Sequence, residues 1–132
     1  MKMVTPSWRH PPLETLADDP RVPKPVGFQV LVLVPPAEDR TAGGIVLPDA
    51  ARDREQTGSM LARVVALGPD AYRDGKRFPT GHYCEQGDWV VLPPYAGIRL
   101  KITLDDGDHE VRLVNDDTIS ATVADPFSIA RK

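Results

Sequence analysis

Cysteines, aromatic residues and long apolar runs are scarce in this chain of 132 residues. Its single cysteine, Cys84, excludes a disulfide framework within the chain and suits a reducing compartment. Aromatic residues make up only 6% of the chain, too few for the stacking surfaces that bind single-stranded nucleic acid. No apolar stretch approaches the length of a membrane span, and the N-terminus has no apolar signal-peptide core. These absences predict a soluble protein of the cytoplasm.

An excess of positive charge is also missing. The formal net charge is -3, whereas a general binder of nucleic acid or anionic membranes normally carries a basic patch. The length suits one domain with appendages. We expect a proline-rich arm over residues 1–25, one domain over residues 26–124, and a C-terminal tail over residues 125–132.

Short apolar runs separated by turn residues dominate the expected domain. Several are rich in β-branched residues, and residues 98–104 alternate apolar with polar side chains, as in a half-buried strand. No long amphipathic helix pattern interrupts them. This pattern predicts an all-β fold, a small irregular antiparallel β-barrel. The expected strands lie within residues 26–34, 60–67, 87–92, 98–104, 110–114 and 118–123.

Two segments carry few apolar residues and many turn residues. Residues 1–25 hold six of the 14 prolines, which predicts an extended or irregular arm, with Trp8 and either Leu13 or Leu16 as anchors. Residues 68–87 are rich in glycine, proline and charge, and predict a long excursion with a possible hairpin at Asp74-Gly75.

One apolar run has no obvious place in the barrel. Ile45, Val46 and Leu47 follow the pair Gly43-Gly44 and precede Pro48, within a charged segment over residues 37–57. A short buried strand after a turn is one interpretation. The other is an apolar motif on a tether, because paired glycines make the backbone costly to order and leave the three side chains available to a partner.

The order of these elements resembles that of the GroES-type co-chaperonins. Four pieces over about residues 26–124 carry the resemblance: a first strand followed by the motif at residues 43–48, a strand ending at residues 64–68, the run at residues 87–91, and a last strand at residues 117–123. No single piece is decisive, but their order is specific. The proline-rich arm and the tail are additions to the family pattern, and they resemble the divergent co-chaperonins carried by bacteriophages.

The resemblance implies a function and a set of partners. In that family, a ring of seven subunits caps an ATP-dependent GroEL-type chaperonin and encloses unfolded client protein; ATP is bound by the chaperonin, so no cofactor is expected here. The implied chaperonin-binding residues are Gly43, Gly44, Ile45, Val46, Leu47 and Pro48. Segments at the first and last strands pair between subunits in the family, which implies interface residues Val30, Leu31, Val32, Leu33, Val34, Ile119, Ala121 and Val123. A phage-encoded protein would act in the host cytoplasm.

A different class of function stays open. The 25-residue arm would also suit a virion structural or decoration protein built on the same fold, with the arm and tail as clamps.

Catalytic and metal-binding chemistry find little support. Structural zinc needs four ligands in paired short spacings. The chain has His82 near Cys84, but Cys84 is its single cysteine. The acidic residues at 105–110 lack the spacing of a calcium loop, and no nucleophile elbow or phosphate-binding loop occurs. We therefore expect no catalytic residue, no metal site and no enzyme activity.

Overall fold

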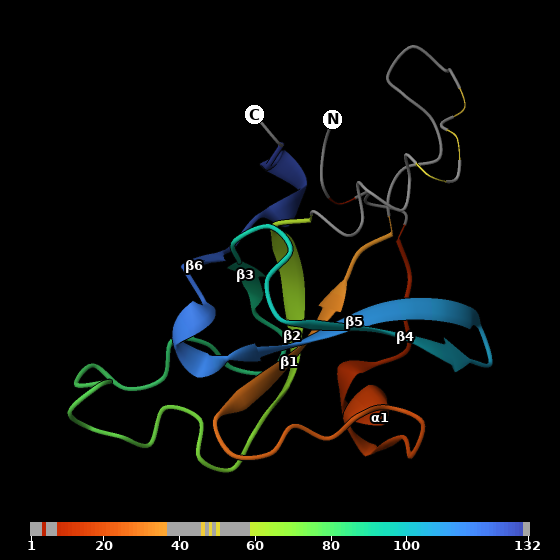
Figure 1. The fold of residues 1–132 in the computed structure, drawn as a ribbon. Coiled ribbons are helices and arrows are strands. Elements are labelled where there is room, and N and C mark those ends of the chain that lie inside the picture. The colour runs from red at the N-terminus through yellow and green to blue at the C-terminus, as the bar shows by residue number, and fades with distance from the viewer. Residues whose placement is uncertain are drawn as a thin grey trace.

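The computed structural model describes Val4, residues 8–36, Val46, Pro48, Ala50 and residues 59–130. Six strands form one antiparallel sheet in the order β4-β5-β1-β2-β3-β6, which confirms the expected all-β fold (Figure 1). The elements run α1 Leu13–Asp18, β1 Gln29–Val34, β2 Leu61–Leu67, β3 Trp89–Val91, β4 Ile98–Leu104, β5 Gly107–Asn115, η1 Asp116–Thr118, β6 Ala121–Val123 and η2 Pro126–Ser128.

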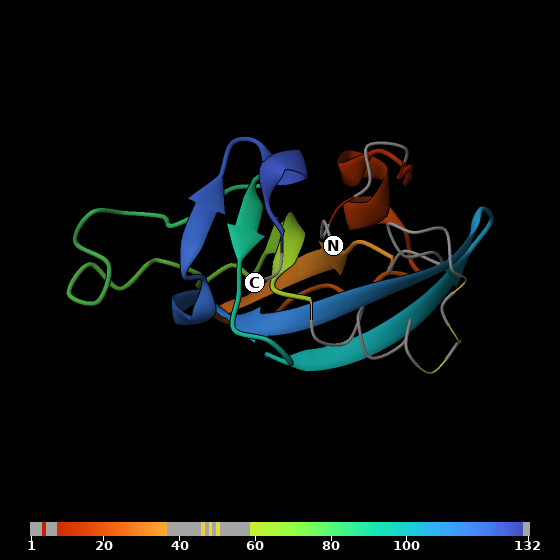
Figure 2. The ribbon, with the colours of Figure 1, turned by 90° about the horizontal axis from the view of Figure 1, so that it is seen from above.

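The sheet curves, and its two halves differ in length. The long β4–β5 hairpin extends on one side, while the short strands β3 and β6 lie at the other (Figure 2). β1 lies near the middle of the sheet and pairs along its length with β5 on one side and β2 on the other. The edge strands are β4, paired with β5, and β6, paired with β3.

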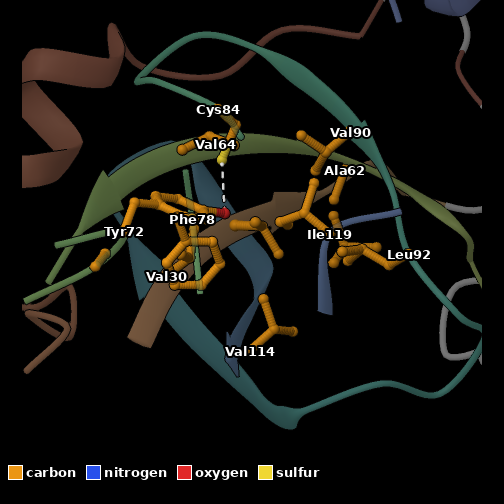
Figure 3. Close-up of a cluster of buried hydrophobic side chains, with 13 residues drawn as sticks. Val30, Ala62, Val64, Tyr72, Phe78, Cys84, Val90, Leu92, Val114 and Ile119 are labelled. Atoms are coloured by element: carbon orange, nitrogen blue, oxygen red, sulfur yellow. Dashed lines mark hydrogen bonds between the residues drawn. The ribbon is translucent and has the colours of Figure 1, made fainter. Parts of the chain in front are cut away.

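Alternate residues of β1 enter two different cores, which explains why this strand is apolar on both faces. Its even-numbered valines lie in the inner core, shown in Figure 3, while Leu31 and Leu33 lie in the outer core. The inner core comprises Val30, Val32, Val34, Ala62, Val64, Ala71, Tyr72, Phe78, Cys84, Val90, Leu92, Val114 and Ile119. The outer core comprises Leu13, Leu16, Val22, Leu31, Leu33, Val65, Ile102, Leu104 and Val111.

The arm contributes a helix to the outer core, contrary to the expectation of an irregular arm. Helix α1 begins directly after Pro12 and ends before Asp19, whose backbone is extended ahead of Pro20. Proline is compatible with the start of a helix because the first N–H groups have no partner within it. Leu13 and Leu16 are the buried residues of α1, as the sequence suggested for the arm's anchors. The arm is therefore part of the packed fold.

Polar contacts fix the chain after α1. The Arg21 guanidinium donates to Asp19 Oδ2 at 2.9 Å and to Asp105 Oδ1 at 2.8 Å, which ties the arm to the turn between β4 and β5. The hydrogen bonds from Arg21 lower the pKa of Asp19 to about 2. The carboxylate therefore stays ionised, and the contact persists, over the whole neutral and mildly acidic range.

Residues 68–88, all of which the structure describes, contain turns and no strand, so the hairpin expected at Asp74-Gly75 is wrong. An aromatic cluster organises this segment instead. The rings of Tyr72 and Phe78 meet edge to face at 5.0 Å between centroids, and Tyr83 contacts both, at 5.1 Å from each. An Asp-Gly turn makes a hairpin only between two alternating apolar runs, and no such runs flank Gly75.

Tyr72 joins this segment to the sheet. Its hydroxyl donates to the backbone oxygen of Asp116 at 2.7 Å and lies 3.6 Å from Cys84 Sγ (Figure 3). Its backbone N–H donates to Asp116 Oδ2 at 3.1 Å, which supports the left-handed backbone of Tyr72 at φ 60°. Both residues are buried. Tyr72 and Asp116 therefore fasten the excursion to η1, directly after β5.

Tyr72→Phe is expected to lower the free energy of unfolding by about 1–3 kcal/mol, because it leaves the buried Asp116 carbonyl without this donor. Tyr83→Phe is the matched control, since Tyr83 is 40% exposed, and it should change stability by less than ~0.5 kcal/mol. Urea denaturation followed by circular dichroism measures both. Equal stability of the two variants would contradict this role of the Tyr72 hydroxyl.

The same contact has a signature at alkaline pH. Burial raises the pKa of Tyr72 above its ordinary value of 10.0, so the folded state favours the neutral phenol. The resulting stabilisation is complete below the ordinary pKa and is lost as the pH rises above it. Above pH 10, the stability of the wild-type chain should therefore fall more steeply than that of Tyr72→Phe.

Candidate functional site

The apolar motif at residues 43–48 lies in the connection between two neighbouring strands, β1 and β2. Val46 is 59% exposed and Pro48 is also exposed, so the part of the motif that the structure describes presents an aliphatic side chain to solvent. Gly43, Gly44, Ile45 and Leu47 lie outside the described residues. A short buried strand, the first interpretation of this run, does not fit the exposure of Val46.

The point where the chain re-enters the sheet is held by a buried cation. Arg112 of β5 is fully buried, and its Nη1 donates to the backbone oxygen of Ser59 at 3.0 Å. The Ser59 hydroxyl donates in turn to the backbone oxygen of Leu61 at 3.0 Å, at the start of β2. The Leu92 N–H donates to the Met60 backbone oxygen at 2.8 Å. Hydrogen bonds to the backbone of Ser59, Met60 and Leu61 thus fix the chain where the connection from β1 enters β2.

A carboxylate balances this cation. Arg112 Nε and Nη2 both lie 3.0 Å from Glu110 Oε2. Burial raises the pKa of Glu110, and the Arg112 charge opposes that rise. A buried cation is strongly destabilising without a partner, so Glu110 and the Ser59 carbonyl together allow Arg112 to occupy this position.

Five of the residues expected at a subunit interface lie elsewhere. Val30, Leu31, Val32, Leu33 and Val34 are 0–2% exposed, and both edges of β1 are paired within the chain. The expectation that they pair with another subunit is wrong, because neither side chains nor backbone edges are accessible. The apolar character of both faces comes from the two cores. Ile119 is likewise buried in the inner core, ahead of β6.

The last strand does lie at an edge. Ala121 and Val123 belong to β6, opposite Val91 and Trp89 of β3, and Ala121 is exposed while Val123 is half-buried. These two residues remain candidates for pairing with a second chain.

Four other apolar residues are exposed, although the sequence alone does not single them out. Val26 is 72% exposed and Phe28 is 47% exposed, just before β1, while Ile98 is 60% and Leu100 is 38% exposed on the edge strand β4. Alternation placed Ile98, Leu100, Ile102 and Leu104 on one face of β4. Of these four residues, only Ile102 and Leu104 are buried in the outer core. The sequence does not show how much of this face of β4 other residues cover.

The acidic turn between β4 and β5 is occupied by local contacts. Asp106 Oδ1 lies 2.8 Å from His109 Nε2, a hydrogen bond that lowers the pKa of Asp106, and Asp108 accepts from the Thr103 hydroxyl. Among the described residues, no group of three or more His, Cys, Asp or Glu side chains could hold a metal ion. Likewise, no helix in the described part is long and apolar enough to cross a membrane.

Two of the sequence pieces that define the strand order have a clear structural purpose. The Gly68 N–H donates to the Gln29 oxygen at 2.8 Å, and a Cβ at Gly68 would lie 2.4 Å from the Gly27 oxygen. The Gly87 N–H donates to the Val64 oxygen at 2.9 Å from a left-handed backbone at φ 94°. Gly68 thus allows a close approach between backbones beside β1, and Gly87 allows a left-handed turn beside β2.

Comparison with known families agrees with this arrangement. The family model described as Chaperonin 10 Kd subunit matches residues 23–123. The match covers the six strands and the connection that carries the motif at residues 43–48, and it leaves α1 and the C-terminal tail outside. That family is one of co-chaperonins and not of enzymes, and it implies an oligomer that works with a GroEL-type chaperonin. The chain therefore belongs to the chaperonin-10 family of co-chaperonins.

Proposed function

We propose that this chain forms a ring, of seven subunits, that caps an ATP-dependent GroEL-type chaperonin and encloses folding client protein. The observation that carries the proposal is the exposed Val46 within the motif at residues 43–48, in a chain of the chaperonin-10 family. In this proposal, Ile45, Val46 and Leu47 enter an apolar groove of the chaperonin. ATP is bound by the chaperonin, and the lid acts in the cytoplasm.

The energetics favour a motif on a tether that is costly to order. Burial of three aliphatic side chains gains roughly 4–9 kcal/mol per subunit. Seven such gains would exceed the practical ceiling of about 20 kcal/mol for non-covalent association, and a lid bound so tightly would not be released. Ordering about ten residues around Gly43 and Gly44 costs on the order of 10 kcal/mol, which offsets most of the gain. Avidity across the ring then supplies the net affinity.

The ring itself needs complementary edges on each subunit. The edge strand β6 offers Ala121 and Val123, and the exposed Val26, Phe28, Ile98 and Leu100 offer apolar surface. A head-to-tail contact between two different edges generates a closed ring when the rotation closes, and it removes exposed sheet edges. We propose Ala121 and Val123 as interface residues on this ground.

Co-purification with a GroEL-type chaperonin, with and without ATP, tests the proposal. We expect capture that depends on nucleotide, and native mass spectrometry of the free chain should give a ring of seven subunits. A ring of another size would change the subunit count but leave the lid function intact. Failure of a folded, ring-forming chain to bind chaperonin in any nucleotide state would contradict it.

A further inference from the structure

Three segments distant in sequence surround one groove. Its floor is a row of cross-strand neighbours, because Arg63 of β2 pairs with Trp89 of β3, and Trp89 pairs with Val123 of β6. Trp8 and His10 of the arm form one wall, and Phe127 of η2 forms another. The groove is open to solvent on one side, and its volume is about 700 Å³, within the range of roughly 300–1,000 Å³ typical of small-molecule sites. We call this the aromatic groove.

Three rings of the groove, those of Trp8, His10 and Trp89, contact one another. Trp8 meets Trp89 edge to face at 5.7 Å between ring centroids, and His10 lies 4.8 Å from Trp8. Phe127 is 40% exposed at the opposite wall. Such a set of ring faces and edges, held in place before any ligand arrives, favours a flat aromatic ligand over a branched aliphatic one.

Positive charge accompanies these rings. The Arg63 guanidinium carbon lies 5.6 Å from the centre of the Trp89 ring, and its Nε donates to the Gly87 oxygen at 3.1 Å, which fixes its position. Arg9 also lines the groove. Asp88 is the one acidic residue among the described residues of the lining, and its Oδ2 accepts from the Glu85 N–H at 2.9 Å. Among the described lining residues, two arginines thus accompany one carboxylate.

We propose that the aromatic groove binds a small planar anion, that is, an aromatic ring that carries a phosphate or carboxylate. The ring packs against Trp8, Trp89 and Phe127, and the anionic group pairs with Arg63. A guanidinium that is already stacked on an aromatic face loses little freedom on binding, and its planar donors match both phosphate and carboxylate. This site is separate from the motif at residues 43–48, so the proposal does not depend on chaperonin binding. One residue of its floor, Val123, also lies on the β6 edge proposed above for pairing in the ring.

The chain carries its own probe for this site. Trp8 and Trp89 are its only two tryptophans, and both line the groove, so tryptophan fluorescence reports on the groove alone. The full-length chain is titrated with adenosine monophosphate and with phenylacetate. Each of these two planar anions joins a planar aromatic ring to an anionic group, a phosphate or a carboxylate. Adenosine provides the ring without the charge, and ribose 5-phosphate provides the charge without the ring. Binding of adenosine monophosphate would identify the ligand's anionic group as a phosphate, and binding of phenylacetate would identify it as a carboxylate.

We expect a saturable fluorescence change for at least one planar anion, with a dissociation constant on the order of 0.1–1 mM, and at least about 10-fold weaker binding of adenosine and ribose 5-phosphate. Arg63→Gln should weaken the binding about 10-fold, while Arg73→Gln, at an exposed position outside the groove, should leave it unchanged. Phe127→Ala serves as a second variant, because its exposed ring contributes little to folding. The absence of saturable binding by both planar anions would overturn the proposal. So would binding that neither Arg63→Gln nor Phe127→Ala alters.

Discussion

Val46→Asp is expected to abolish capture of this chain by chaperonin. The valine side chain is 59% exposed, so the fold should lose less than ~0.5 kcal/mol. In an apolar groove of the chaperonin, the substitution removes about 1.5–3 kcal/mol of apolar burial and adds the cost of a carboxylate without a partner. The affinity of each subunit should therefore fall at least about 100-fold. Because a ring repeats the loss in every subunit, no complex should remain detectable.

Two further substitutions show whether this loss is specific to the motif. Val46→Ile keeps an aliphatic side chain and should retain capture. Tyr95→Asp places the same charge at another exposed residue, 56% accessible, whose left-handed backbone suits aspartate. Capture is measured by co-purification with chaperonin in the presence of ATP, after native mass spectrometry has shown that each variant forms the ring. Undiminished capture of Val46→Asp would show that the motif at residues 43–48 does not bind the chaperonin.

Gly68→Ala should be strongly destabilising, although it adds only a single methyl group. The added Cβ would lie 2.4 Å from the Gly27 oxygen and 3.0 Å from the Gln29 oxygen, and neither backbone atom can rotate away. The strain would break the hydrogen bonds Gly68 N–H to Gln29 oxygen and Asp70 N–H to Gly27 oxygen. Overpacking together with lost buried hydrogen bonds predicts a loss of about 3–5 kcal/mol. That is a large share of the stability of a small domain.

Gly75→Ala is the matched control for this prediction. A Cβ at Gly75 meets nothing within 4 Å, so the same chemical change should alter stability by less than ~1 kcal/mol. Urea denaturation curves, followed by circular dichroism and tryptophan fluorescence, give both values. If Gly68→Ala proved as stable as Gly75→Ala, the close approach at Gly68 would not be a determinant of the fold.

The strands could be predicted from the sequence because they obey local rules. Alternation over residues 98–104 gives the bounds of β4, and the β-branched run before Pro35 contains β1. The function of β1 could not be derived in the same way. An uninterrupted apolar strand indicates burial on both faces but not what buries them, and here the second face is covered by Leu13, Leu16 and Val22 of the same chain.

Helix α1 shows why the arm was misinterpreted. The density of prolines argued against regular structure, yet Pro11, Pro12 and Pro20 lie outside the six residues of the helix. Proline blocks the interior of a helix but not its boundaries. Leu13 and Leu16, three residues apart, lie on one face of this six-residue helix, and contact with the sheet stabilises a helix too short to form alone.

The surroundings of the motif were also beyond sequence reasoning. Arg112 lies between Val111 and Leu113 in an alternating strand, which predicts a solvent-facing cation, yet it is fully buried against Glu110 and Ser59. Local alternation cannot reveal this, because the partner Ser59 is distant in sequence. The motif itself was visible, since two glycines, three aliphatic residues and a proline are contiguous.

Electron microscopy of this chain mixed with a GroEL-type chaperonin and ATP tests the lid function most directly. We expect additional density that caps the end of the chaperonin ring, with contacts at the apolar grooves that receive residues 45–47. The density should be missing when Val46→Asp replaces the wild-type chain. Uncapped chaperonin beside intact free rings of the wild-type chain would contradict the account.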